Sequence, residues 1–225
     1  MLGAPDTDAE RADDADSDSV DPLELAELNK ERVRILLDRC GILFRELLQR
    51  EAPAFRWAAV FRTLRLMELS GELLSGCFFQ GIPGPQFISH QAFQELKRGL
   101  PDQRIFWLNA CDPISLCGVS VDSLKRELPR RIPGNHVVYR GAEIAVVSQR
   151  QGKAVTINLA EDDPDLPECL GVISHLLQRD FQPLKRIKVE TINEEPAAGS
   201  VYAATLARQF DAQPDGQSLT LYRRV

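Results

Sequence analysis

The apolar side chains in the first third of the chain recur at helical spacing, which predicts helices from about residue 22 onward. Gly41 interrupts the first apolar stripe, so the pattern fits either one bent helix or two. Pro53 is predicted to open a further helix, and Gly71 to end it. The two stripes consist of Val33, Leu36, Leu37, Cys40, Leu43, Phe44, Leu47 and Leu48, followed by Trp57, Val60, Phe61, Leu64 and Met67.

The stretch after the second stripe loses helical spacing and predicts a β-hairpin. Two short β-prone pieces, residues 77–80 and 86–89, flank a Gly-Ile-Pro-Gly-Pro turn. A short helix over His90–Arg98 follows, with Gly99 at its end. Helices followed by a two-stranded hairpin form the winged-helix variant of the helix-turn-helix motif, in which the helix before the hairpin is the recognition helix.

The second half of the chain is predicted to be rich in β-strands joined by tight turns. We therefore expect an α+β fold. An N-terminal winged-helix domain over residues 22–100 is followed by a small β-barrel or β-sheet domain with flanking helices over residues 101–225. The predicted strands are 104–109, 136–139, 143–149, 154–159, 185–191 and 218–223, and the predicted helices are 168–180 and 201–210.

The net charge of −6 is unevenly distributed along the chain, which changes what it implies about partners. Residues 1–30 contain ten acidic and two basic side chains, so the rest of the chain is slightly basic. Residues 1–21 are expected to form an acidic disordered leader, because they have almost no large apolar side chain to bury. Of the 27 basic residues 21 are arginines, whose guanidinium groups suit phosphate recognition. A GC-rich genome would produce the same arginine bias, and both explanations stay open.

Several kinds of enzyme leave no signature in this chain. The P-loop pattern, zinc-binding clusters of cysteine and histidine, and a Gly-x-Ser-x-Gly elbow are absent from the sequence, so we expect no catalytic residue, metal site or cofactor. The sequence also lacks a secretory signal and an apolar run of roughly 18 residues. Its five cysteines are scattered, which favours a reduced, cytoplasmic compartment without membrane contact. One weak catalytic hint is Gln149-Arg150-Gln151, a Gln-x-Gln triplet of the kind that some alkylpurine glycosylases use.

Aromatic side chains lie beside cations at several places, a combination typical of surfaces that stack bases and contact phosphates. Trp57 and Phe61 fall on the apolar stripe, so core packing is the favoured interpretation for them. Phe106 and Trp107 are neighbours in a predicted strand, so one of the two should face outward.

Five segments, in order along the chain, carry a resemblance to a known family. Residues from about 35 onward resemble the C-terminal region of Lhr-type (large helicase-related) DNA helicases, often labelled the DEAD/H-associated domain. The segments are LLDRCGILFRELLQRE at 36–51, FRTLRLMELSGELLSGCFFQGIPGPQF at 61–87, NACDPISLCG at 109–118, PGNHVVYRG at 133–141 and IKVETIN at 187–193.

The resemblance implies a winged-helix domain and a β-rich DEAD/H-associated domain that together bind single-stranded DNA behind two RecA-like motor domains. ATP-dependent 3′-to-5′ unwinding and DNA repair then belong to the whole helicase. ATP and magnesium are expected only for the motor domains, which this chain lacks and which would act in cis or in trans. A fragment, the second half of a split gene and a stand-alone subunit all fit this pattern.

The resemblance also indicates which residues contact nucleic acid. Arg62 and Arg65 lie on the recognition-like helix, and arginine and asparagine suit backbone contacts that position a strand without reading its sequence. Asp112 is expected to be structural, because an Asp before a proline forms turns. The nucleic-acid-binding candidates, with Trp107 added from the aromatic pattern, are Arg62, Arg65, Gln86, Phe87, Trp107, Asn109, Arg131, Asn135 and Arg140.

Two alternative functions stay open at this point. The chain would be a protein-interaction module if Leu66 and Leu69, which lie off the main apolar stripe, dock on separately encoded motor domains. It would be a DNA-repair enzyme of the glycosylase type if Gln149 and Gln151 act on a base.

Overall fold

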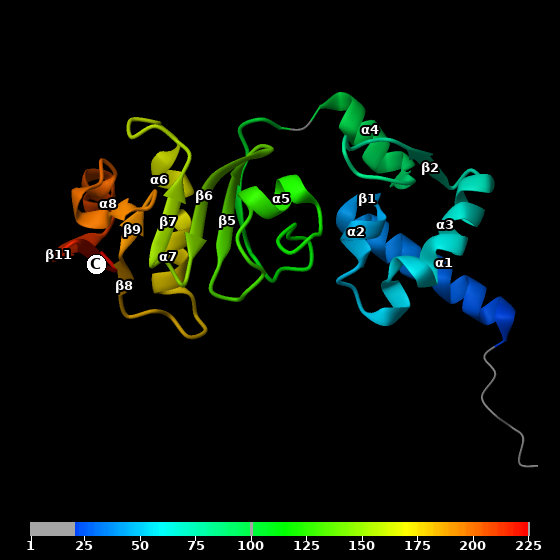
Figure 1. The fold of residues 1–225 in the computed structure, drawn as a ribbon, viewed down its shortest axis with the longest axis horizontal. Helices are drawn as coiled ribbons and strands as arrows, with labels where there is room; N and C mark the ends of the chain where they lie inside the picture. The colour runs from blue at the N-terminus through cyan, green and yellow to red at the C-terminus, as the bar shows by residue number, and fades with distance from the viewer. Residues whose placement is uncertain (1–20, 100, 225) are drawn as a thin grey trace, which may run out of the picture.

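The computed structural model describes residues 21–99 and 101–224 and arranges them in two lobes along one long axis. In Figure 1 the first lobe, coloured blue to green, consists of helices and short strands and ends with α4 (His90–Arg98). The second lobe begins with β4 (Ile105–Asn109) and continues to the red strands at the C-terminus. The acidic leader predicted over residues 1–21 lies almost entirely outside the described residues.

The first lobe has the order of elements of a winged helix, as predicted. Three antiparallel strands form a small sheet in the order β1-β3-β2, and α3 leads directly into the β2–β3 hairpin. The elements are α1 (Pro22–Cys40), β1 (Ile42–Leu43), α2 (Arg45–Leu48), the 3₁₀ turn η1 (Pro53–Phe55), α3 (Trp57–Leu69), β2 (Leu73–Gly76), β3 (Gln86–Ser89) and α4.

Gly41 divides the first apolar stripe into two helices, which settles the question left open by the sequence. The residue has a φ of 72°, in the left-handed region that glycine adopts without a steric penalty. Its N–H donates to the Leu37 carbonyl (2.7 Å) and so closes the end of α1. The chain then turns into β1, which pairs with β3.

The core of the first lobe forms where α1, α3 and the sheet meet. Leu36, Leu64 and Phe87 are fully buried in it. Trp57 and Phe61 stack on each other with ring centroids 5.1 Å apart and pack against this core, which confirms the core interpretation of both aromatics.

The first strand of the hairpin was predicted four residues too late. It covers Leu73–Gly76, and residues 77–85 form the turn. The aromatic residues Phe78 and Phe79 suggested a strand, but their backbone N–H groups donate to the side chain of Gln86. Because these two N–H groups are already bonded to a side chain, they do not extend the backbone hydrogen bonds between the hairpin strands. We call residues 77–85 the wing.

The second lobe contains two sheets. The larger has six strands in the order β10-β9-β7-β6-β5-β4, and the smaller has three in the order β11-β12-β8. The strands are β4, β5 (His136–Arg140), β6 (Glu143–Gln149), β7 (Ala154–Ile157), β8 (Ile187–Val189), β9 (Thr191–Ile192), β10 (Glu195–Pro196), β11 (Asp211–Asp215) and β12 (Ser218–Tyr222). The helical elements are α5 (Asp122–Glu127), α6 (Leu166–Cys169), α7 (Gly171–Gln178), the 3₁₀ turn η2 (Ala197–Gly199) and α8 (Ala203–Gln209).

Both sheets are open, so the barrel alternative is wrong and the sheet alternative holds. In the six-stranded sheet β4 and β10 are the two edges, and each pairs with one neighbour. Closure would require these edges to pair with each other, but β10 has two residues and offers almost no ladder for such a pairing.

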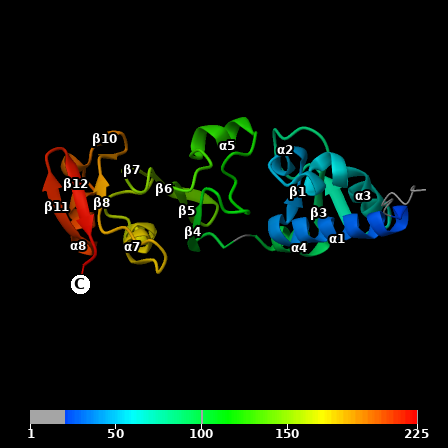
Figure 2. The ribbon, with the colours of Figure 1, turned by 90° about the horizontal axis from the view of Figure 1, so that it is seen from below.

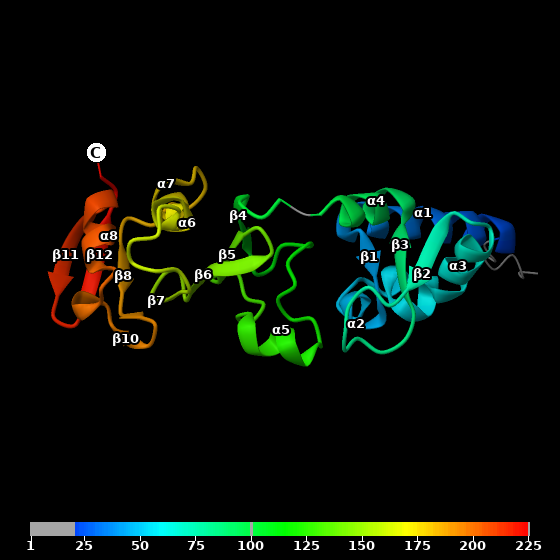
Figure 3. The same ribbon diagram turned by 90° about the horizontal axis from the view of Figure 1, so that it is seen from above.

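The two faces of the six-stranded sheet are covered differently. Figures 2 and 3 show α7 on one side of the sheet and α5 on the other. The α7 side holds the main core, to which Val138, Val146 and Ile173 contribute fully buried side chains. The α5 side has only a small apolar cluster around Ala110 and Val137. Part of this second face is therefore left open.

The two lobes touch where the segment after α2 meets the loop that follows β4. The Arg50 guanidinium donates to the carbonyls of Cys117 (3.0 Å) and Pro113 (3.2 Å). Val119, from the same loop, is 1% exposed and belongs to the core of the first lobe. Within residues 21–99 and 101–224, no helix combines the length and the apolar character needed to cross a bilayer.

Candidate nucleic-acid interface

Helix α3 occupies the recognition position and presents a mixed basic and apolar face to solvent. Arg62 and Arg65 are both exposed, as the helical spacing predicted. Arg65 forms an ion pair with Glu68, and Arg62 forms none within the described part of the chain. Leu66 is 52% exposed and Leu69 is 78% exposed on the same face. The face therefore offers one paired and one available guanidinium beside two apolar side chains.

Gln86 organises the wing rather than contacting solvent. Its side chain is fully buried, and its Oε1 accepts from the N–H groups of Phe78 (2.9 Å) and Phe79 (2.8 Å). Its Nε2 donates to the carbonyls of Phe79 (3.0 Å) and Ile82 (3.3 Å). All four hydrogen-bonding positions of the carboxamide are thus used, and the wing is fixed to β3 from inside.

Two aromatic residues of the hairpin have opposite placements. Phe87 is fully buried in the core, so its side chain does not reach a strand outside. Phe79 was not a candidate in the sequence, yet its ring is 44% exposed at the wing and rests edge-on against Phe44. An exposed ring on a rigid loop provides a surface on which a base could stack. The signal that could have found it is the pair of phenylalanines next to the glycine-rich turn.

Asn109 and Asn135 hold loops of the second lobe together. The Asn109 amide donates to the Pro133 carbonyl (2.8 Å), and Asn135 donates to the Arg130 carbonyl (2.9 Å). Asn135 also accepts from the Arg150 N–H (3.0 Å) and is 3% exposed. These contacts use the side chains internally, and a strand outside cannot reach Asn135.

Arg131 and Arg140 also bind within the protein. Arg131 donates to the three successive carbonyls of residues 110–112, at 2.9 to 3.1 Å, and so ties down the loop after β4. Arg140 forms ion pairs with Asp163 (2.8 Å) and Asp165 (3.4 Å). The Asp165 N–H and the Arg140 guanidinium together lower the pKa of Asp163, so both charges persist at neutral pH.

Trp107 faces the core, and its neighbour Phe106 faces outward. The Trp107 ring lies 4.3 Å from the His175 ring and packs against the main core. Phe106 is 39% exposed and stacks on Tyr139 with centroids 5.2 Å apart. The expectation that one of the two points outward is confirmed, and the outward ring is Phe106.

His136 is buried and electrically neutral. Burial first, and then the nearby His175 and Arg179, together lower its pKa from 6.5 to about 4. Its Nε2 lies 3.1 Å from the Asn109 amide nitrogen, so the amide donates and the ring carries its proton on Nδ1. This Nδ1 and the hydroxyl of Ser148, the cross-strand partner of His136, are buried without a hydrogen-bond partner in the described residues.

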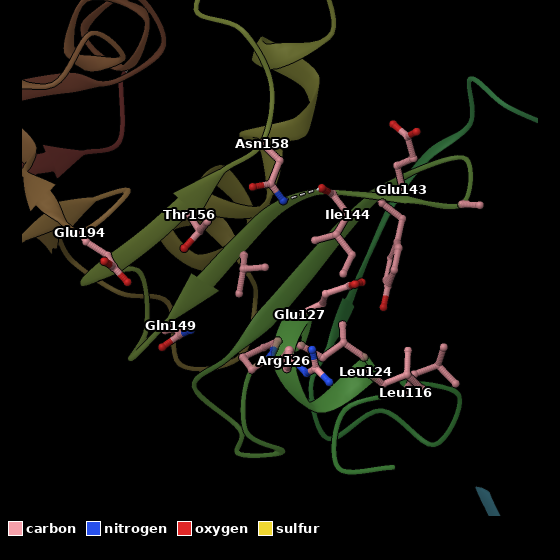
Figure 4. Close-up of a pocket in the computed structure, with 15 residues that line it drawn as sticks. Leu116, Leu124, Arg126, Glu127, Glu143, Ile144, Gln149, Thr156, Asn158 and Glu194 are labelled. Atoms are coloured by element: carbon pink, nitrogen blue, oxygen red, sulfur yellow. Dashed lines mark hydrogen bonds between the residues drawn. The ribbon is translucent and has the colours of Figure 1, made fainter. Parts of the chain in front are cut away.

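The Gln149-Arg150-Gln151 triplet spans the end of β6 and the start of the turn to β7. Arg150 and Gln151 have φ values of 52° and 60°, an unusual conformation for residues other than glycine. Gln149 lines a groove of about 730 Å³ on the α5 side of the sheet, and Gln151 is exposed next to Gly134. Figure 4 shows the Gln149 carboxamide at one end of this groove. Across residues 21–99 and 101–224, no group of three or more potential metal ligands occurs.

Comparison with known proteins defines the class of the first lobe. Residues 23–105 match the family described as the winged-helix domain of large helicase-related proteins. The chain is also 25% identical over 209 residues to "Lhr helicase/uracil glycosylase" of Escherichia coli (strain K12). That similarity covers 88% of this chain and 13% of the relative, so the chain spans about an eighth of the protein that it matches. The chain contains an Lhr-type winged-helix region, and the resemblance seen in the sequence is confirmed.

Proposed function

We propose that this chain is a nucleic-acid-binding accessory module of an Lhr-type, ATP-dependent DNA helicase. It binds single-stranded DNA, and RecA-like motor domains, in cis or in trans, supply ATP hydrolysis and unwinding. The winged-helix match and the distant similarity to the Escherichia coli helicase support this function. The observation that carries it is the exposure of Arg62 and Arg65 on α3, the helix that leads into the wing.

The DNA-contacting set that we propose differs from the one expected from the sequence. Arg62 and Arg65 contact backbone phosphates, and Phe79 on the wing stacks on a base. Gln86 and Asn135 position loops instead of touching the strand, because their side chains are buried and already bonded. Phe87, Trp107, Asn109, Arg131 and Arg140 likewise act inside the protein.

The test is single-strand binding, measured by fluorescence anisotropy with a labelled oligonucleotide over a range of salt concentrations. Two phosphate contacts should contribute about −1.4 to the slope of log affinity against log salt. Arg62→Ala/Arg65→Ala should therefore weaken binding and flatten the slope by about this amount. Arg186→Ala/Arg208→Ala removes two exposed arginines of the second lobe and serves as the matched control. Equal slopes for the two double variants would contradict the proposal.

Docking on motor domains is a second candidate, favoured by the exposure of Leu66 and Leu69. A helix that recognises only phosphates has no need of two exposed leucines. If this face binds protein, Leu66→Ser/Leu69→Ser should abolish capture of a purified Lhr-type motor domain and leave DNA binding unchanged. Loss of DNA binding with intact capture would assign the face to DNA instead.

Excision of uracil from DNA is a third candidate, because the Escherichia coli relative is named a uracil glycosylase as well as a helicase. The groove beside Gln149 is large enough for a base. Incubation of the chain with a uracil-containing oligonucleotide, followed by alkaline cleavage at abasic sites, tests this candidate. Product that disappears in Gln149→Ala would support it, and absence of product would dismiss it.

A further inference from the structure

The groove on the α5 side of the six-stranded sheet has an apolar floor. Figure 4 shows it between α5 and the exposed face of strands β5 to β7. Tyr139, Ile144 and Val147 contribute to it from the sheet, and Leu116 and Leu124 contribute from the opposite wall. Burial raises the pKa of Tyr139 to about 12, so this part of the floor carries no charge at neutral pH.

Carboxylates are distributed along the edge of this groove. Glu127, Glu143 and Glu194 line it and are exposed, and none of them forms an ion pair within the described ranges 21–99 and 101–224. Figure 4 shows Glu194 at one end, Glu127 near the middle and Glu143 toward the other end. Arg126 is the single basic side chain among the lining residues. The groove therefore combines an apolar floor with an excess of negative charge along its length.

The placement of α5 explains why the groove is open. The opposite face of the sheet is covered by α7 and the main core, whereas α5 has six residues and covers only one part of this face. Beyond α5, the strands β6 and β7 present Gln149 and Thr156 to the groove. Leu116 remains 36% exposed at its wall, which leaves apolar surface available to a partner.

We propose that this groove binds a basic amphipathic peptide segment of a partner protein. Its apolar side chains would pack on the floor, and its arginine or lysine side chains would pair with Glu127, Glu143 and Glu194. Charge complementarity decides between possible occupants. Unpaired carboxylates repel the phosphates of a nucleic acid, whereas they attract a cationic peptide. The groove is thus a protein-binding surface on the second lobe, separate from the α3 face that we propose for DNA.

The experiment uses the full chain and a fluorescein-labelled, 14-residue model peptide composed of leucine, arginine and lysine. A peptide in which glutamate replaces the basic residues is the charge control. Anisotropy titration should detect binding of the basic peptide only, and this binding should weaken with salt. Glu127→Gln/Glu143→Gln/Glu194→Gln should weaken it by about tenfold, since each exposed ion pair contributes modestly.

Two further variants separate the groove from general acidity. Glu24→Gln/Glu95→Gln/Glu168→Gln removes three exposed carboxylates elsewhere and should leave peptide binding unchanged. Leu116→Ser alters the apolar wall at an exposed position and should weaken binding without unfolding the chain. Equal affinity of the two triple variants, or equal affinity for the acidic peptide, would overturn the proposal.

Competing occupants of the groove give distinct results. Light scattering that shows a dimer of the chain, abolished by the groove triple variant, would mean that a second copy occupies the groove and would overturn the proposal. A single-stranded oligonucleotide is then added to displace the labelled peptide. If it still displaces the peptide from the Arg62→Ala/Arg65→Ala variant, the groove binds nucleic acid, which would also overturn the proposal. Lack of competition in that variant supports a peptide site independent of the DNA-binding face.

Discussion

Replacing Gln86 by leucine should loosen the wing while the core beneath it stays packed. The carboxamide makes four hydrogen bonds to the backbone of the wing, at 2.8 to 3.3 Å. Leucine has a similar volume but offers no donor or acceptor, so these four backbone groups lose their partners. At a net value of about 1 kcal/mol for each bond, the expected loss in the free energy of unfolding is about 4 kcal/mol.

Two measurements test this expectation on the full chain. Urea unfolding followed by tryptophan fluorescence gives the change in free energy, and amide hydrogen exchange reports the wing directly. The amides of Phe78 and Phe79 should lose their protection in Gln86→Leu, whereas amides in the core of α3 should keep theirs. Gln91→Leu, which removes an exposed glutamine with one weak contact on α4, should change neither measurement.

A further variant separates the two halves of the carboxamide. Gln86→Glu keeps both acceptor positions but loses the donations to Phe79 and Ile82, and it buries a charge. It should therefore destabilise the chain at neutral pH and recover part of the stability in acid, when the carboxyl is protonated. A loss below about 1 kcal/mol in Gln86→Leu, with unchanged exchange at the wing, would refute the reasoning.

Three other predictions concern the second lobe. The pKa of His136 is about 4 in the folded protein and 6.5 in the unfolded chain. The free energy of unfolding should therefore reach its full value, as far as this histidine is concerned, above about pH 6.5. It should fall by about 3 kcal/mol as the pH drops to about 4, a loss that His136→Gln should remove in urea titrations at several pH values. Gly141→Ala would place a Cβ 2.5 Å from the Asp102 carbonyl oxygen at a φ of +59°, so its melting temperature should fall. Gly216→Ala has similar φ but open space, and should cost less. Arg131→Met should destabilise the chain by about 3 kcal/mol, because three carbonyls lose a charged donor, while the salt slope of DNA binding stays constant.

Local signals predicted the elements whose boundaries depend on their own residues. Helix α4 begins after Ser89, which caps it, and ends at Gly99, as expected. Strand β6 also has its predicted boundaries, because polar residues flank its continuous apolar run, and four successive residues of the strand are buried. The winged-helix arrangement follows from these pieces together with α3 and the hairpin.

Elements that depend on distant partners were not predictable. Strand β11 contains two aspartates and Pro214, a composition unfavourable for strands, and it forms because β12 pairs with all five of its residues. The short strands β9 and β10 meet at Asn193, whose side chain pairs with the backbone of Ile157, 36 residues away. No pattern within either segment encodes such contacts.

The sequence predicted which residues stand out in the candidate site better than it predicted what each of them does. Arg62 and Arg65 are exposed because helical spacing places them off the buried stripe. Gln86 and Asn135 were candidates because they lie in segments that resemble the helicase family. Their partners are backbone groups of neighbouring loops, and a sequence does not show where those groups will be. The same reason applies to Arg131: its residue type predicts a phosphate contact, whereas its three partners are backbone carbonyls.

The contact between the lobes has a consequence for how the chain can be divided. A polypeptide ending at residue 100 would contain every helix and strand of the first lobe but would lack Val119, which completes its core, and both carbonyls that hold Arg50. Such a piece would expose apolar surface of the core, and the Arg50 guanidinium would lose its two carbonyl acceptors to water. The loop after β4 is thus part of the first lobe's core, and a polypeptide meant to fold as an independent winged helix should extend past Val121, which also packs on that core.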